Sequence, residues 1–546
     1  MLPRHKQLIA LAVFFGGLVL ASRLPLAPGQ LFSFDDINFA YAIGDFDPRV
    51  SQPHPPGYPL FVVQTRLLSW MRFKRAESNL LALALLGSAA ALVALALFGD
   101  RLLGADAGLC GAWLLVFHPS FWYAGLTSAI RPQLALVSVG VAWTCYRAWR
   151  GEAAWIYGGA VALGVGAGIR PEMGLLLFPL WAASVARSGA AWRDRLRAFG
   201  VLVVVVLAWL VPTVLQSGGP RSYLLYCWRY LVEQASLTSG LFGAEPQKWH
   251  ASIVWLLVWT LGGALAWPLA TALARRRGEG WGWKRGQLGF LALWFCPSFL
   301  FALLVHIADA GQALAMLPVA CLVGGHMVSR AASRLEAWLP RPHALVFLLI
   351  PSFFLDALIF FRPVWYYKGN STSGWRVTAE RIWADVYSGL HLSSLGQIRG
   401  VARLDDVALQ ELRRLEAERP GRTVVLWERG ATSWRKTAYY FPQVPVVVLN
   451  DRIRRAGSIH WVTVMQGPRI QGRRVDLAPL TIRLPAGARL VWMVNPKTDF
   501  LERLKQGLPL RNSDPLYFCD LPEQDGEARV GSYLLSWAAT RASLEL

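Results

Sequence analysis

The chain has few charged residues for its length. Of its 546 residues only 16% are Asp, Glu, Lys or Arg, whereas 54% are hydrophobic. This composition excludes an ordinary soluble protein and indicates a polytopic membrane protein. Acidic residues are the scarcer kind, 34 against 55 Lys and Arg. The basic residues cluster in short loops between apolar runs, which orients membrane helices, so no nucleic-acid partner is predicted.

Cysteine patterns are also lacking. The six cysteines include no CxxC pair, so neither a metal cluster nor a disulfide framework is indicated. Four of them lie inside apolar runs: Cys110, Cys145, Cys296 and Cys321. Cys227 and Cys519 are the two that could pair outside the membrane.

A signal-peptide cleavage site is missing as well. The first apolar run, residues 7–20, reaches Arg23 without a small-residue A-x-A site, so we expect a retained first helix. Ten more runs have spanning character: residues 78–98, 104–118, 132–148, 154–169, 171–186, 199–216, 251–273, 287–305, 312–329 and 343–361. We therefore predict about 11 crossings, with a cytoplasmic N-terminus that puts the strongest basic loops on one side.

Residues 58–73, YPLFVVQTRLLSWMRF, are not counted as a span. A helix of this length reaches only ~24 Å, and it would put Gln64 and Arg66 near the bilayer centre. We expect an interfacial or re-entrant juxtamembrane helix that follows a first external loop over residues 24–57. Both belong to a transmembrane domain predicted over residues 1–361.

The tail, residues 362–546, has soluble patterns in place of long apolar runs. Residues 405–421 predict a helix with Asp405 as its N-cap and a Pro-Gly stop. Four short apolar segments predict strands: residues 423–427, 444–449, 461–465 and 490–494. The tail is therefore expected to form a small external α/β domain.

No predicted span carries an acidic or basic residue near its middle, in contrast to many ion-coupled transporters. Such residues gather instead at the predicted external ends: Asp35, Asp36, Asp45, Asp47, His54, Arg131, Arg170, Glu172, His306 and Asp309. The arrangement predicts a site at the outer membrane face.

Each candidate also has an ordinary structural interpretation. The pair Asp35 and Asp36 can supply a general base, or be a solvated acid pair or helix cap. Arg170 can hold a phosphate or anchor a helix end at the interface. His306 can cap a helix or contact a phosphate or metal, although a single histidine is weak evidence for metal.

Taken together, the motifs resemble those of a known superfamily. A retained first helix, the acidic pair, HPPGYPL at residues 54–60, GIRPEMG at 168–174 and HIADAGQ at 306–312 resemble the GT-C glycosyltransferases. The bacterial relatives of the protein O-mannosyltransferases and of the lipid A aminoarabinose transferases are most similar in pattern. The resemblance covers residues 1–361; the tail matches only in position.

The resemblance implies an inverting transferase of a hexosyl or pentosyl group that uses a polyprenyl-phosphate sugar as donor. It implies that Asp35 is the base and Asp36 its neighbour. The substrate or the donor phosphate would be contacted by five residues: His54, Tyr58, Arg131, Arg170 and His306. A structural cap on the proline corner is the alternative role for His54. Residues 121–134 lack the carboxylate that many relatives carry there, so no metal or other cofactor is expected.

Other functions fit parts of the pattern. A lipid-linked oligosaccharide flippase or another transporter, an O-antigen ligase-like enzyme and a non-enzymatic scaffold are the alternatives. The expected location is the plasma (inner) membrane, with the tail periplasmic or extracellular. The acceptor can be a glycan, a lipid or a protein, and nothing in the sequence identifies the sugar, the lipid length or the oligomeric state.

Overall fold

The computed structural model describes most of the chain: residues 4–71, 73–239, 249–262, 285–305, 309–361, 376–428, 433–449, 461–466, 469–474, 480–494, 499–530 and 533–541. The chain divides into two compact units. Met1–Gln30 and Ala42–Ile398 form the first, called the membrane unit below, and Leu31–Tyr41 with Arg399–Leu546 form the second, the C-terminal unit. The expected boundary between residues 361 and 362 stays a prediction.

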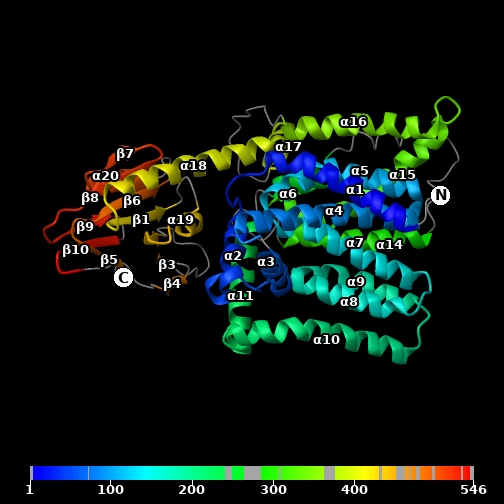
Figure 1. Ribbon diagram of the computed structural model, residues 1–546, viewed down its shortest axis with the longest axis horizontal. Helices are drawn as coiled ribbons and strands as arrows, with labels where there is room; N and C mark the ends of the chain where they lie inside the picture. Colours follow the sequence, from blue (N-terminus) through cyan, green and yellow to red (C-terminus); the bar gives the residue numbers. More distant parts are fainter. Residues whose placement is uncertain are drawn as a thin grey trace. The chain divides into compact units, whose positions relative to one another are not determined.

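The membrane unit is helical, and its long helices run side by side as a bundle (Figure 1). Its α-helices are α1 (Arg4–Arg23), α3 (Pro59–Met71), α4 (Ala76–Leu103), α5 (Ala105–Phe117), α6 (Pro119–Thr127), α7 (Ile130–Trp149), α8 (Trp155–Ile169), α9 (Pro171–Arg187), α10 (Trp192–Gln216), α11 (Pro220–Thr238), α12 (Trp249–Leu261), α14 (Arg285–Leu304), α15 (Leu317–Leu335), α16 (Arg341–Phe361) and α17 (Ala379–Leu392). Three short 3-10 helices are η1 (Leu24–Leu26), η2 (Pro48–Val50) and η4 (Ala310–Ala315). Each predicted span overlaps one of the α-helices over the residues that the structure describes.

Within the described residues, five helices are long and apolar enough to cross a membrane. They are His5–Leu26, Ala76–Leu103, Trp192–Gln216, Gly286–Leu304 and Arg341–Phe361. The pair α5 and α6, bent by 56°, makes a sixth if it is one span. The multi-span helical architecture is confirmed, whereas the count of 11 crossings stays a prediction.

A buried arginine holds the break between α5 and α6. Arg23, at the end of α1, is fully buried, and its Nη2 donates to the Val116 carbonyl oxygen at 2.8 Å. This carbonyl lies in the last turn of α5, where helix carbonyls lose their intrahelical partners. On the other side of the break, His118 Nδ1 accepts from the Ser120 amide at 3.2 Å and caps α6. The bend therefore has defined partners on both sides.

The helix expected over residues 58–73 is α3. Its 13 residues reach only ~20 Å, too short for a perpendicular crossing. Arg66 has hydrogen-bond partners, because its Nη2 and Nε donate to the carbonyl oxygens of Ala42 and Ile43 at 3.0 and 3.2 Å. These carbonyls end the preceding helix, α2 (Phe34–Gly44). A guanidinium is favourable there because it opposes the negative end of the helix dipole.

The C-terminal unit is built on strands. A sheet in the order β4-β3-β2-β1-β6-β8-β7 has β1 at its centre, parallel to β2 and β6, with antiparallel strands outside them. A second sheet has the order β5-β10-β9. The strands are β1 (Thr423–Glu428), β2 (Val446–Val448), β3 (Trp461–Gln466), β4 (Arg469–Arg474), β5 (Leu480–Pro485), β6 (Arg489–Val494), β7 (Arg511–Ser513), β8 (Leu516–Asp520), β9 (Gly526–Val530) and β10 (Tyr533–Ala538). All four predicted strands are present, which confirms the α/β prediction for the tail.

Three more helices complete this part of the chain: α18 (Leu395–Glu418), α19 (Trp434–Tyr440) and α20 (Asp499–Gly507). The prediction of Asp405 as an N-cap is wrong, because α18 begins ten residues earlier and Asp405 lies inside it. The buried carboxylate of Asp405 is paired with Lys436 of α19 instead. A local pattern does not reveal such a partner.

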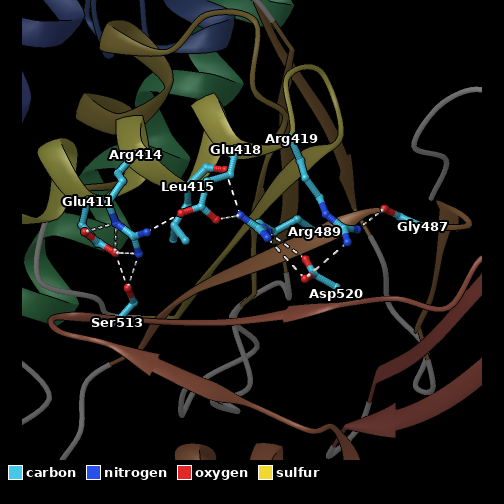
Figure 2. Close-up of polar contacts among 9 residues, drawn as sticks. All are labelled: Glu411, Arg414, Leu415, Glu418, Arg419, Gly487, Arg489, Ser513 and Asp520. Carbon is cyan, nitrogen blue, oxygen red and sulfur yellow. Dashed lines mark hydrogen bonds and ion pairs between the residues drawn. The ribbon is translucent and has the colours of Figure 1, made fainter.

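A network of polar contacts fastens α18 to the large sheet (Figure 2). At its centre, Arg489 donates from Nε to Asp520 Oδ1 at 2.7 Å and from Nη1 to Glu418 Oε2 at 2.6 Å. The Arg489 hydrogen bonds hold the pKa of the Asp520 carboxyl below its usual range.

The six cysteines are all free, so Cys227 and Cys519 do not form a disulfide.

Candidate active site

The acidic pair lies in the first turn of α2. Ser33 precedes the helix, and its Oγ accepts from the Asp36 amide at 3.0 Å, which makes Ser33 the N-cap. Carboxylates in this turn are stabilised by the helix dipole. The two acids differ in exposure: Asp36 is 6% exposed, whereas Asp35 is half-buried. Asp35 is therefore the more accessible of the two, and both belong to the C-terminal unit.

The HPPGYPL corner is a tight turn in the membrane unit that ends where α3 begins. Gly57 has φ +110°, and a Cβ there would lie 3.2 Å from both Pro48 and Thr213 side-chain carbons, so glycine suits both the backbone and the space. Tyr58 also has a positive φ, 46°, which is uncommon for a bulky residue. His54 Nε2 lies 2.8 Å from the Tyr58 hydroxyl, and both side chains are buried.

Arg170 lies beside this corner. It precedes α9, is 7% exposed, and its Nε donates to the Glu172 carboxylate. Its guanidinium carbon is 6.0 Å from the centre of the Tyr58 ring, at the limit of a cation–π contact. On the other side, the His54 ring is 5.1 Å from that of Tyr230. Three predicted site residues, His54, Tyr58 and Arg170, thus form one buried cluster.

Arg131 forms a second buried basic centre, in the first turn of α7. Its Nη2 donates to Asp309 Oδ2 at 2.6 Å, and its side chain is 6% exposed. Its Nη1 is buried and has no hydrogen-bond partner within the described part of the chain. Asp309 also accepts from the Gly311 amide at 2.7 Å through its other oxygen, Oδ1. Arg131 also acts electrostatically on Glu172, the carboxylate that accepts from Arg170.

Other predicted residues have different outcomes. Asp47 caps η2 and pairs with Arg49 at 2.8 Å, which is a structural role. His306 lies outside the described residues. Over the described ranges, no group of three or more His, Cys, Asp or Glu side chains is arranged to hold a metal ion. Metal independence itself stays a prediction.

Some residues were not anticipated from the sequence. Tyr230 packs on His54 from far along the chain, and His250 Nδ1 lies 2.7 Å from Asp385 Oδ2, joining α12 to α17. Asp356, in α16, is a 1% exposed carboxylate inside a predicted span. The prediction concerned only the middle of each span, and Asp356 lies toward the end of residues 343–361, where DAL within an apolar run was a visible signal.

The fold of the chain is similar to that of solved membrane-protein structures. The ArnT structure from Cupriavidus metallidurans bound to undecaprenyl phosphate is similar to the chain at 14% identity and a TM-score of 0.50, over 86% of this chain and 98% of that chain. The ArnT structure in the apo state has 15% identity and a TM-score of 0.52, over 94% and 97%. The chain therefore has the fold of the GT-C membrane glycosyltransferases, as the sequence motifs predicted.

A match to a particular family is confined to part of the chain. Residues 49–192 match the model of the protein O-mannosyl-transferase TMEM260 N-terminal domain. The matched stretch includes the HPPGYPL corner, Arg131 and Arg170, and it begins after the acidic pair. A search of curated proteins found no match.

Proposed function

We propose that the chain is a membrane glycosyltransferase that moves a sugar from a polyprenyl-phosphate donor to an acceptor at the external membrane face. The GT-C fold supports this class, and one ArnT structure with that fold is bound to undecaprenyl phosphate. In this proposal the chain lies in the plasma membrane with its N-terminus in the cytoplasm. The C-terminal unit is periplasmic or extracellular, and the acceptor is a glycan, a lipid or a protein.

The donor phosphate is assigned to the buried basic groups of the membrane unit. Arg131 carries this assignment, because its buried Nη1 has no partner among the described residues while Nη2 is fixed by Asp309. A buried guanidinium with a spare donor is well suited to a phosphate oxygen. Arg170, His54 and Tyr58 are assigned the same phosphate or the adjoining sugar, and His306 retains the role that the sequence motifs imply.

The chemistry follows from these roles. Asp35 takes the proton of the acceptor hydroxyl as its oxygen attacks the anomeric carbon of the donor. The bond from that carbon to the phosphate oxygen breaks, and its electron pair leaves with the polyprenyl phosphate. Cationic groups stabilise the negative charge that develops on the departing phosphate. Attack from the opposite face inverts the anomeric centre, and Asp36 supports Asp35 at the helix end.

The test is transfer by the full-length chain in membrane vesicles supplied with a panel of polyprenyl-phosphate hexoses and pentoses, with and without EDTA. Asp35→Asn keeps the shape of the side chain but cannot accept the proton, so it should abolish transfer with unchanged membrane insertion. The matched control is Asp45→Asn, an exposed carboxylate of the same loop. Transfer by Asp35→Asn at the wild-type rate would reject the base, and loss of transfer in EDTA would reject metal independence.

A flippase is the second candidate, and Asp356 is the observation that favours it. An interior carboxylate in a membrane helix is a common feature of coupled transport. A flippase moves the lipid-linked sugar without forming a glycosidic bond, so the same vesicles would contain translocated donor and no product. An O-antigen ligase-like enzyme would form product, and would be distinguished by its oligosaccharide donor.

A further inference from the structure

Residues 31–41, which include the acidic pair, are packed against α19 of the C-terminal unit, more than 390 residues further along the sequence. The Leu31 amide donates to the Tyr440 hydroxyl at 3.0 Å. The ring of Phe34 meets that of Trp434 at 5.7 Å, and the ring of Tyr41 meets that of Tyr439 at 5.3 Å, both edge to face. All three contacts are made with α19 or its end.

These contacts fix the rotation of α2 as well as its position. Phe34 and Tyr41 are seven residues apart, about two helical turns, so they lie on the same face of the helix. A helix held at two points on one face cannot turn about its own axis. Asp35 follows Phe34 directly, so its direction is set by that docking.

The surface that receives α2 is itself rigidly anchored. Lys436 of α19 makes a buried ion pair with Asp405 of α18, and Tyr41 packs against the core cluster that includes Val425 and Phe441. Breaking a buried ion pair is strongly unfavourable. The helix α19 is therefore a firm base for α2.

Arg435 is the unusual residue in this interface. It is fully buried, and its guanidinium carbon lies 4.8 Å from the centre of the Tyr41 ring and 5.6 Å from that of Trp434. Burial lowers the pKa of Arg435 to about 10, so it is still charged at neutral pH, and burial also raises the pKa of Tyr41. Desolvated cation–π contacts are the strong ones.

We infer that Arg435 is a positioning residue for the first-loop acid, holding α2 through the Tyr41 ring so that Asp35 has one fixed direction. The inference rests on the proposed function, in which Asp35 is the base. It assigns the C-terminal unit a part in catalysis that is separate from any binding of the acceptor. Small displacements of a reacting group are enough to cost about 100-fold in rate.

The packing is tested by hydrogen–deuterium exchange on the full chain in nanodiscs. Arg435→Ala should increase exchange in residues 31–41 at least tenfold, and Arg435→Lys should restore part of the protection. The control is Arg413→Ala, whose guanidinium contacts Phe441 at 5.7 Å and none of residues 31–41 in the described contacts. Unchanged exchange in Arg435→Ala would overturn the inference.

Arg435→Ala can also unfold the whole C-terminal unit, which would be seen as faster exchange in β1 and β6. Tyr41→Leu is then the decisive variant, because it removes the ring that Arg435 faces and leaves α19 intact. It should release residues 31–41 while β1 and β6 stay protected. Protection of residues 31–41 in Tyr41→Leu would overturn the inference.

Transfer assays separate this inference from the proposed function. Arg435→Ala and Tyr41→Leu should lower kcat about 10- to 100-fold with donor KM unchanged, and the double variant should be no slower than the slower single one. Effects that multiply, or a changed KM alone, would contradict positioning through Tyr41. If the wild type transfers no sugar, the proposed function fails, while exchange still reports whether Arg435 holds α2.

Discussion

Replacing Gly311 by alanine should displace Arg131 without replacing any charged residue. A Cβ at Gly311 would lie 2.8 Å from both Cγ and Cδ of Arg131, and 2.8 Å from Asp309 Oδ1. Carbon atoms do not approach this closely, so the Cγ and Cδ atoms of Arg131 must move. The Arg131 guanidinium is paired with Asp309 at 2.6 Å and the side chain is buried, so no other low-energy position is open to it.

The cost to phosphate binding can be estimated. A hydrogen bond to a charged group contributes about 1.5–3 kcal/mol, so losing the one assigned to Arg131 Nη1 should weaken binding about 10- to 150-fold. The assay is titration of undecaprenyl phosphate into the full chain in nanodiscs, read by native mass spectrometry. The matched control is Gly140→Ala on α7, the helix that carries Arg131, where nothing lies within 4 Å of the added methyl group.

The two glycine variants together make the result decisive. Gly140→Ala should bind undecaprenyl phosphate as the wild type does, because it only adds a methyl group to open space. Equal affinity in Gly311→Ala and wild type would refute the assignment of Arg131 to the phosphate. An equal loss of undecaprenyl phosphate affinity in both variants would show that the effect comes from disturbed helix packing and not from Arg131.

The remaining predictions concern the network of Figure 2. Arg489→Ala should destabilise β6 and β8 by about 3 kcal/mol, which is the lower end of the range for a broken buried ion pair, because Glu418 is 41% exposed. Arg414→Ala removes an exposed ion pair and should change the stability little. Amide exchange of the full chain measures both, and equal effects would show that the buried Arg489 contacts stabilise the sheet no more than the exposed Arg414 pair. Because the pKa of Asp520 in the folded state is lowered, its contribution to the free energy of unfolding is complete above about pH 4 and is lost as the pH falls through the folded pKa. Asp520→Asn should reduce the loss of stability at low pH in a near-UV circular dichroism titration. An unchanged loss of stability in the variant would argue against this role of Asp520.

Elements with a strong local signal could be predicted from the sequence. Apolar length predicted the helices of the bundle, and alternating short apolar runs predicted the central strands. Within the site, HPPGYPL predicted a rigid corner, and its His54 and Tyr58 are close in the sequence. Arg170 and Glu172 are likewise two residues apart, so their proximity is local.

Contacts between distant residues could not be predicted. Arg131 and Asp309 are 178 residues apart, and Asp405 pairs with Lys436 across two elements instead of capping its own helix. The local sequence does not indicate that α2 packs on α19. Aromatic residues such as Tyr41 fit the ordinary pattern of an amphipathic helix, and their partner helix is known only from the structure. Tertiary packing decides these cases, and only the structure shows it.

The most direct test of the proposed glycosyltransferase activity is mass spectrometry of cell-envelope glycans from three strains. One strain lacks the chain, one expresses it, and one expresses Asp35→Asn at equal level. A glycosyltransferase with Asp35 as its base should produce a sugar modification in the second strain that is absent from the first and third. Identical glycans in all three strains, or the full modification with Asp35→Asn, would contradict it.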